Sequence, residues 1–429
     1  MDYQLRALNA AEVLGPDPDP EHLDPRVEQW MQAVAMGFLD ARIRGAGRRV
    51  WTEGLVRDQM VLRGVYLDDV PTGALGPDMP VATFTSFDKT LNTGAEQLLD
   101  LHMITDVTVR PSHRRRGLLR QMMTTDLREA KERGLSMAAL TVSEGSIYGR
   151  FGFGAATWCR HIALDTSRRF ALRDEASGRV EMVDPHVHAD LFSDVFRRFH
   201  ATTRGSVDRP NHYRDLSSGT FDDDMLDVDH ARRGAVHHDP SGAVDGYVSY
   251  RVERTDRSRE LKVHDLVATS TDAYLGLWQF LASVDLVERV SFRRAPMEDP
   301  LEFALADPRL YSVTRLEDLI WLRVLDPVRA LEAREWAGAG SCVLEVRDPL
   351  DLAAGRWALE VADGRASVQA TTAPADVTLD VDTLASLYLG GVTAPTLARA
   401  GRLEGSPDAL RAFAELVHLP SRPYSITGF

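Results

Sequence analysis

The chain has 429 residues, of which 44% are hydrophobic and 27% are charged, and its formal net charge is -14 at pH 7. This length favours two or three domains, and the composition is typical of a globular protein in water. The acidic balance argues against nucleic acid and anionic membranes as main partners, because both require a broad basic face. It favours cationic ligands, which an acidic surface attracts.

The cellular compartment is predicted from what the sequence lacks. No stretch reaches the apolar length of a membrane helix, and the residues after Met1 lack the basic-then-apolar order of a signal peptide. The two cysteines, Cys159 and Cys342, lie far apart and predict no disulfide framework. We therefore expect a cytoplasmic protein.

The first part of the chain alternates between helix and strand patterns. Four prolines in Gly15–Pro25 exclude a helix and predict an extended lead-in. Residues 27–43 carry apolar side chains at helical spacing. Residues 79–91 and 98–111 have the β-branched content and alternation of strands, and Pro111 ends the second one.

An α/β unit is predicted after Pro111. An arginine-rich loop leads into a helix whose apolar side runs from Leu118 to Leu127, and residues 136–144 form a strand of the buried parallel kind. Strand, loop, helix and strand in this order define the unit. Residues 261–286 repeat the pattern without the arginines and their glycine, which predicts a duplication whose second copy has lost its anion site.

The last part of the chain has a different pattern. Short alternating strands lie between Ser341 and Val381, and a helix follows with Ser406 as N-cap and a proline in its first turn. This predicts an α+β domain. Residues 419–429 carry prolines and closely spaced apolar side chains, so we expect an extended and anchored tail.

The arginine-rich loop has the features of a small anion site. Five arginines lie between Arg110 and Arg120. A helix start presents free backbone N–H groups and a positive dipole end, and Gly117 allows a phosphate to approach the backbone. The P-loop spacing and a dinucleotide fingerprint are both absent. The glycines of residues 149–154 predict a bend before the next strand.

Two sequence runs carry a resemblance to a known family. Arg114-x-x-Gly117-x-Leu119 resembles the pyrophosphate loop of the GNAT superfamily of N-acetyltransferases, although Leu119 replaces a small residue. "HRRRGLLR" and "SEGSIYGRFGFG" resemble the Eis (enhanced intracellular survival) acetyltransferases in particular. The resemblance implies α/β and α+β architecture: a catalytic GNAT domain (1–160), a degenerate GNAT-like domain (161–314) and a sterol-carrier-like domain (315–429) whose terminus reaches the active site.

The resemblance also implies a function. It predicts a homohexameric, acetyl-CoA-dependent enzyme that acetylates several amines of a polycationic substrate, such as an aminoglycoside or polyamine, and thereby confers antibiotic resistance. Lysine side chains are a further class of acceptor. Tyr148 matches the family's general acid, and the terminal carboxylate, on Phe429 here, matches its general base. The residues implied to bind acetyl-CoA are Val107, Thr108, Val109, Arg115, Arg116, Gly117, Leu118, Leu119, Arg120, Ser143 and Glu144. No metal ion is implied.

The amine pocket is implied to contain Asp40, Trp51 and Asp106. Asp106 stands where relatives often carry an aromatic residue, and Gly428 stands where some carry glutamate. Both departures affect the expected amine specificity more than the chemistry. Acyl transfer needs a proton for the leaving thiolate and an acceptor for the proton of the amine, and a tyrosine and a carboxylate can supply these.

Other readings of the sequence are less favourable. A carrier or regulatory module would use the sterol-carrier-like domain to bind a lipid or acyl-CoA, but it has no need of the arginine loop. A nucleic-acid regulator conflicts with the acidic balance. Ser143, His113 and Glu144 lack the nucleophile-elbow pattern of a hydrolase. The pairs His186/His188 and His237/His238 could bind metal, but the loop-like composition around them favours surface histidines.

Overall fold

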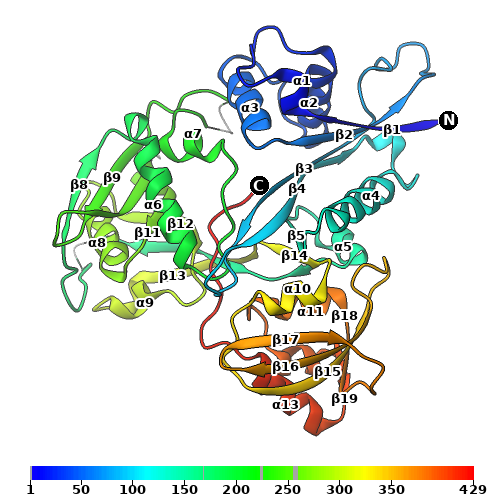
Figure 1. Ribbon diagram of the computed structural model, residues 1–429. Coiled ribbons are helices and arrows are strands. Elements are labelled where there is room, and N and C mark those ends of the chain that lie inside the picture. The colour runs from blue at the N-terminus through cyan, green and yellow to red at the C-terminus, as the bar shows by residue number, and fades with distance from the viewer. Residues whose placement is uncertain (1, 168, 223–225, 255–258) are drawn as a thin grey trace.

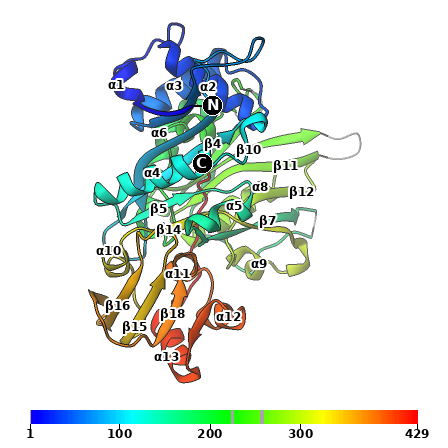
Figure 2. The same cartoon turned by 90° about the vertical axis from the view of Figure 1, so that its right-hand side faces the viewer.

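Three β-sheets organise the chain, and each is packed with helices. The computed structural model describes residues 2–167, 169–222, 226–254 and 259–429. The first sheet lies in the centre of Figure 1, the second at the left and the third at the bottom. The C-terminus lies between the first and second sheets, as Figures 1 and 2 both show.

The first sheet has the strand order β1-β2-β3-β4-β5-β14-β6, and its neighbours are antiparallel except β4 and β5. Helix α4 connects this parallel pair and buries Met122, Met123 and Leu127 against the sheet, as the sequence predicts. Helix α2 packs on the opposite face through Val27, Trp30 and Val34. The elements are β1 (Tyr3–Asn9), β2 (Val61–Leu67), β3 (Ala82–Leu91), β4 (Leu99–Val109), β5 (Met137–Leu140), β6 (Gly154–Ala155), β14 (Trp321–Val324), α1 (Ala10–Leu14), α2 (Pro25–Phe38), α3 (Gly45–Arg57), α4 (Leu118–Glu132) and α5 (Gly145–Tyr148).

The second sheet, β13-β7-β12-β11-β10-β9-β8, also contains one parallel pair, β11 and β12. Helix α8 connects this pair, and the side chain of Ser270 caps it by accepting from the N–H of Ala273 at 3.0 Å. The predicted strand, turn and helix of residues 261–286 are confirmed. The elements are β7 (Trp158–Asp165), β8 (Arg179–Val183), β9 (Arg233–His238), β10 (Val244–Arg254), β11 (Arg259–Ala268), β12 (Arg289–Ala295), β13 (Tyr311–Asp318), α6 (Ala189–Thr202), α7 (Tyr213–Ser218), α8 (Thr271–Ala282) and α9 (Pro300–Ala304).

The third sheet, β17-β16-β15-β18-β19, forms the predicted α+β unit. Ser406 caps α13 by accepting from the N–H of Ala409 at 3.2 Å, and Phe413 of this helix is buried. The elements are β15 (Gly340–Arg347), β16 (Gly355–Ala362), β17 (Arg365–Ala370), β18 (Val377–Asp380), β19 (Leu403–Gly405), α10 (Pro327–Glu332), α11 (Val381–Tyr388), α12 (Ala394–Arg399) and α13 (Pro407–Val417).

The chain crosses between sheets on both sides of the predicted domain limits. β7 starts the second sheet at Trp158, and β14 returns to the first sheet at residues 321–324, after β13 has completed the second. The domain limits 1–160, 161–314 and 315–429 therefore stay predictions. The chain does not pass from one sheet to the next at a single linker, since β14 returns to the first sheet after the second is complete.

The third unit is docked tightly on the first sheet. A Cβ at Gly154 of β6 would lie 1.9 Å from the carbonyl oxygen of Asp382 in α11, so the two backbones touch at a position that only glycine allows. Arg323 of β14 is fully buried and pairs with both oxygens of Asp348 at 2.7 and 2.6 Å. Its Nε donates to the carbonyl oxygen of Phe151 at 2.7 Å. Arg323 thus joins Asp348 of the third unit to the turn that follows α5.

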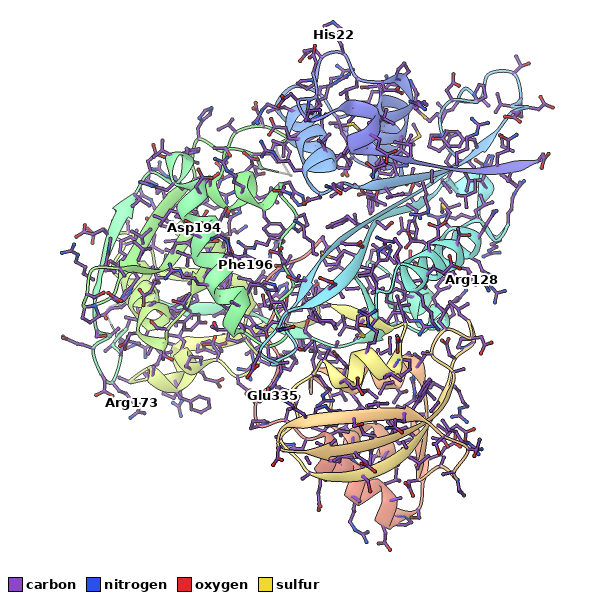
Figure 3. All side chains as sticks on the ribbon, in the orientation of Figure 1. His22, Arg128, Arg173, Asp194, Phe196 and Glu335 are labelled. Atoms are coloured by element: carbon purple, nitrogen blue, oxygen red, sulfur yellow. The ribbon has the colours of Figure 1, made fainter. Side chains whose placement is uncertain are left out.

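The C-terminal tail runs extended from the third unit to the centre of the molecule. The N–H of Tyr424 donates to the carbonyl of Arg204 at 2.8 Å, and Thr427 Oγ1 donates to the carbonyl of Val207 at 2.9 Å. Ile426 lies in an apolar cluster of the second unit. Arg204 also pairs with Glu335 at 2.8 Å, near the base of the tail (Figure 3). The predicted extended and anchored tail is confirmed.

No helix in the described part of the chain is long and apolar enough to cross a membrane. Cys159 and Cys342 are both free and buried.

Candidate active site

The candidate site lies where β4 and β5 diverge. The last parallel pair is Ile104↔Leu140, yet β4 continues to Val109, so the edge of residues 105–109 that faces β5 leaves the ladder. Val107, Thr108 and Val109 lie on this diverging stretch. The side chain of Thr108 is already engaged, at 2.6 Å from Thr83 Oγ1. Free backbone groups at such a split can bind an extended amide-containing ligand.

The arginine loop and the start of α4 stand beside this split. Gly117 takes a left-handed φ of +77° at the N-cap, and a Cβ built there would meet no atom within 4 Å. No side chain caps the helix, so its first N–H groups are available. The side chain of Leu118 is buried, so Leu118 can contact a bound anion only through its backbone N–H.

The arginines of the loop differ in how firmly they are held. Arg116 donates to Tyr3 Oη at 2.8 Å and lies over the Tyr3 ring. Arg115 and Arg120 are exposed, and Leu119 beside them is half-buried. Flexible guanidinium groups beside an uncapped helix start suit a phosphate or pyrophosphate.

Tyr148 ends the short helix α5 after β5 and is buried. Its ring packs edge-to-face on Phe153 at 6.4 Å. Burial, and secondarily the carboxylate of Glu144, raise the pKa of Tyr148, so its phenol is protonated at neutral pH. Ser143 and Glu144, between β5 and α5, are exposed at the same end of the split. A protonated phenol at this end of the split can act as a proton donor.

The tail delivers Phe429 to the other side of the split. Thr141, directly after β5, donates its hydroxyl to the main-chain oxygen of Phe429, and the Phe429 ring meets that of Phe87 at 6.2 Å. Leu140 and Tyr148 belong to the apolar cluster on the α4 side of the sheet, whereas Phe429 packs against the cluster on the α2 side. Tyr148 and the terminal carboxylate therefore approach the gap from opposite faces.

Asp106 lies on the α2 face, as Phe429 does. It forms a bulge in β4 with a left-handed φ of +53°, which is rare for a residue other than glycine. One carboxylate oxygen accepts from Thr85 Oγ1 at 2.9 Å. Burial raises the pKa of Asp106 to about 6. Thr85, which binds Asp106, and Phe87, which contacts the Phe429 ring, are two residues apart on the same face of β3, about 7 Å, so both carboxyl groups belong to this face of the split.

The two other residues predicted for the amine pocket are placed differently. A Cβ at Gly37 of α2 would lie 2.4 Å from Thr108, so the end of α2 touches β4 two residues from Asp106. Asp40 follows this contact and is exposed. Trp51 on α3 is half-buried and packs against the apolar core. Asp40 therefore follows the end of α2 that contacts β4, whereas Trp51 belongs to the apolar core.

Comparison with known proteins identifies the family. Residues 25–156 and 205–324 each match an acetyltransferase (GNAT) domain family, and residues 327–426 match a sterol carrier protein domain family. The chain is 37% identical over 407 residues to an uncharacterized N-acetyltransferase of Streptomyces griseus, covering 92% of this chain and 95% of that protein. It is 38% identical over 339 residues to the N-acetyltransferase Eis of Mycobacterium tuberculosis, covering 76% and 80%. The chain belongs to the Eis family of N-acetyltransferases.

The predicted architecture and enzyme class are confirmed. This Eis-family chain is an N-acetyltransferase with two GNAT domains and a sterol-carrier-like domain. It superposes on the crystal structure of Eis1 from Mycobacterium abscessus with a TM-score of 0.80 and 27% identity, covering 100% of both chains. The GNAT domains imply acetyl-CoA as co-substrate.

Outside the split, one group of side chains in the described part of the Eis-family chain has metal-ligating composition. Ligand atoms of Cys159, His161 and Glu317 lie within 4.8 Å of one another. His161 and Glu317 already form an ion pair at 2.8 Å, and Arg315 binds the second oxygen of that carboxylate at 3.1 Å. The positive charge of Arg315 and the ion pair between Glu317 and His161 disfavour a metal ion at this position.

The predicted surface position of His237 is wrong. It is buried on β9 and pairs with Asp245 at 2.6 Å, because a strand rather than a loop carries it. Asp184 caps the turn that carries His186 by accepting from its backbone N–H at 3.1 Å, and the same carboxylate lies 3.0 Å from His186 Nδ1.

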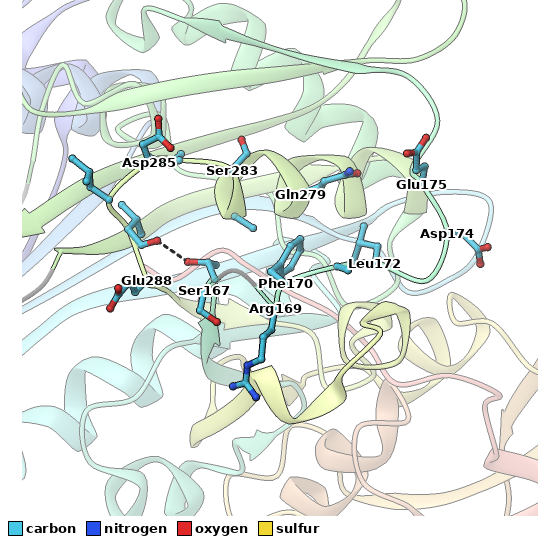
Figure 4. Close-up of a pocket in the computed structure, with 16 residues that line it drawn as sticks. Ser167, Arg169, Phe170, Leu172, Asp174, Glu175, Gln279, Ser283, Asp285 and Glu288 are labelled. Carbon is cyan, nitrogen blue, oxygen red and sulfur yellow. Dashed lines mark hydrogen bonds between the residues drawn. The ribbon is translucent and has the colours of Figure 1, made fainter.

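A large hollow of the Eis-family chain lies elsewhere, between α8 and the segment after β7 (Figure 4). All its lining residues belong to the second sheet's unit, and none is a predicted site residue. Carboxylates outnumber cations on its rim, which carries Asp174, Glu175, Asp285, Glu288 and Arg169.

Sequence reasoning missed three residues of this region. Thr141 binds the terminal main-chain oxygen, Tyr213 binds the main chain of Gly428, and Arg323 supports the turn after Tyr148. Their partners lie 288, 215 and 172 residues away in sequence, and none stands in a recognisable motif.

Proposed function

We propose that this Eis-family enzyme acetylates amines of small polycationic molecules, aminoglycosides and polyamines among them, and that it acts at several positions of one substrate. The observation that carries the proposal is the pair of carboxyl groups, on Asp106 and at the C-terminus, on one face of the β4/β5 split. Two anions attract a molecule with several ammonium groups and favour its presentation to the acetyl donor.

The residues present fit acetyl-CoA. The backbone of Val107–Val109, with Ser143 and Glu144 opposite, would line the pantetheine arm. The N–H groups of Gly117, Leu118 and Leu119 would hold the pyrophosphate together with Arg115, Arg116 and Arg120. Bound acetyl-CoA would supply the acetyl group as an activated thioester.

Tyr148 is the proposed general acid. When the C–N bond forms and the C–S bond breaks, the leaving sulfur carries negative charge and needs a proton. The raised pKa keeps the phenol protonated at neutral pH, and Tyr148 Oη donates that proton.

The terminal carboxylate of Phe429 is the proposed general base. It lies across the gap from Tyr148, so an amine that enters from the α2 face meets the carboxylate before it meets the thioester. The carboxylate accepts the proton of the amine nitrogen, while Asp106 and Asp40 attract the other ammonium groups and Trp51 lines the pocket wall.

The proposed function includes a homohexamer in the cytoplasm and a contribution to antibiotic resistance, as in the family that the chain resembles. Light scattering behind a sizing column tests the assembly. A monomeric, fully active enzyme would overturn the hexamer without affecting the chemistry.

A lipid or acyl-CoA carrier is less well supported. The apolar interior of the third unit is continuous with that of the first, for Leu344, Leu379 and Leu384 join Ile320 and Leu322 in one cluster. This shared core favours a docked structural unit over a free-standing carrier.

The test is thiol release from acetyl-CoA across a matched panel of amines. We expect turnover with aminoglycosides and polyamines, more than one equivalent of thiol per substrate molecule, and weak turnover with monoamines of similar size. Equal rates with monoamines, or acetylation of lysine peptides alone, would contradict the proposed substrate class.

A further inference from the structure

We propose that Tyr213 is a positioning residue of the reaction: its phenol fixes the main chain of Gly428 and so aims the adjacent terminal carboxylate at the amine. The inference rests on the proposed role of Phe429 as general base. It assigns a function to the second unit, whose GNAT sheet has no arginine loop.

Tyr213 forms hydrogen bonds with both main-chain polar groups of the penultimate residue, Gly428. Tyr213 Oη donates to the carbonyl oxygen of Gly428 at 2.7 Å and accepts from the N–H of the same residue at 2.8 Å. These two hydrogen bonds engage the successive peptide units on either side of the Gly428 Cα and so restrict φ and ψ of Gly428, which leaves the bonds within Phe429 between this held segment and the carboxylate. Thr141 and Phe87 then hold the oxygen and the ring of Phe429.

Tyr213 is itself held by a buried cation. The guanidinium of Arg209 lies 4.7 Å from the centre of the Tyr213 ring and 4.1 Å from that of Phe196, which Figure 3 labels on α6. Asp265 accepts from Arg209 at 2.7 and 2.9 Å. Burial opposes the charge, but Asp265 and its neighbours raise the pKa of Arg209, so the guanidinium stays charged. The phenol is therefore fixed from the second unit.

The other tail contacts do not replace this one. Tyr424 Oη donates to the carbonyl of Arg294 at 2.6 Å, Thr427 binds Val207, and Ser425, Ile426 and Thr427 are buried. These contacts anchor the tail up to residue 427. Gly428 and Phe429 are only half-buried, and glycine has the widest backbone freedom of any residue. Without the Tyr213 hydroxyl, only the Thr141 hydroxyl and the ring of Phe87 would still hold Phe429, so the carboxylate would be aimed less precisely although the tail stays bound.

The experiment compares Tyr213→Phe with Tyr424→Phe, two single-atom deletions that each remove a tyrosine hydroxyl from the tail's hydrogen bonds. We expect Tyr213→Phe to lower kcat about 10- to 100-fold, with KM for acetyl-CoA and the thermal midpoint almost unchanged. Tyr424→Phe should keep kcat within about twofold. A Tyr213→Phe enzyme with wild-type kcat would overturn the inference.

A double-variant cycle separates positioning from a merely structural role. The cycle combines Tyr213→Phe with a protein whose Phe429 carboxylate is converted to an amide by semisynthesis. Because Tyr213 acts through that carboxylate, the substitution should cost no further kcat in the amidated protein. The same loss in both backgrounds would overturn the positioning role. An amidated protein with full activity would overturn the base assignment itself, which is a distinguishable failure.

Discussion

In the proposed mechanism, the departure of the thiolate depends on the phenol of Tyr148. Its burial among Phe151, Phe153 and the α4 side chains sets its pKa and fixes its direction. Tyr148→Phe keeps the ring and the packing and deletes only the proton donor. We expect kcat to fall about 10²-fold with KM for acetyl-CoA almost unchanged, measured by thiol release. Wild-type turnover would show that solvent or another group protonates the sulfur.

The exposed arginines of the loop allow a test with a control on the same helix. Arg115→Ala with Arg120→Ala should raise KM for acetyl-CoA at least about tenfold, because both groups are exposed and beside the α4 start. Arg128, exposed further along α4 and labelled in Figure 3, is the matched control. Arg128→Ala should leave KM unchanged, and equal effects of the two variants would show that general charge, not a site, binds the cofactor.

If Asp106 binds the amine as proposed, amine binding should depend on pH. Its pKa of about 6 means that the carboxyl group is charged at pH 7 and becomes neutral as the pH falls through that value. The KM for a polycationic amine should therefore rise below about pH 6, several-fold by pH 5. Asp106→Asn should show the raised KM at all pH values and lose this step. A step that persists in the variant would assign it to another group.

At the scale of elements, α4 is held to the sheet by a buried ionic network. His102 lies between Asp126 at 2.7 Å and Asp88 at 2.8 Å, and Arg63 pairs with Asp126 at 2.6 Å. Burial would lower the pKa of His102, but the two carboxylates outweigh it and raise it. The carboxyl pKa of Asp126 is lowered, against the effect of burial, by His102 and Arg63. Helix α4, which begins at the arginine loop, is thus held to the sheet by ion pairs as well as by apolar packing.

This network predicts how stability depends on pH. Because the pKa of His102 is raised in the folded state, its contribution is complete below about pH 6.5 and is lost as the pH rises through the raised value. In that window the unfolding free energy should fall by up to about 1.4 kcal/mol per pH unit. Urea unfolding of His102→Gln should lack this slope, while His22→Gln, at an exposed loop position labelled in Figure 3, should keep it. An equal slope in all three proteins would refute the assignment.

The sequence predicts those helices and strands whose signals lie within a few neighbouring residues. Gly117 with the periodic side chains of α4, the alternation in β4 and the cap at Ser406 each act within a few residues, and the structure bears them out. Helix α2 ends at Phe38 rather than at residue 43, because Leu39 takes a left-handed φ of +68° that no periodicity signals. The strand β1 and helix α1 were not predicted, since their short patterns are ambiguous without their partner β2.

At the scale of the whole molecule, the site depends on contacts between distant parts of the chain. β14 completes the first sheet, Arg323 ties the turn after Tyr148 to the third unit, and Tyr213 holds the tail. Sequence alone assigned Tyr148 and the terminal carboxylate to the site only by resemblance to a family, because pairings across hundreds of residues leave no local pattern. The partners of His102 are nearer, 14 and 24 residues away, but still too far apart for a local pattern to reveal the ionic network that joins β4 to α4 and β3.

The proposed transfer of the amine proton to the terminal carboxylate of Phe429 is tested most directly by converting that carboxylate to an amide. Semisynthesis changes charge without adding bulk, whereas a C-terminal tag changes both. With thiol release measured on an aminoglycoside, the amidated enzyme should lose about 10²-fold or more in kcat while its KM for acetyl-CoA stays near the wild-type value. Full activity of the amidated enzyme would contradict the claim and leave Asp106, Glu144 or a water that they orient as the base.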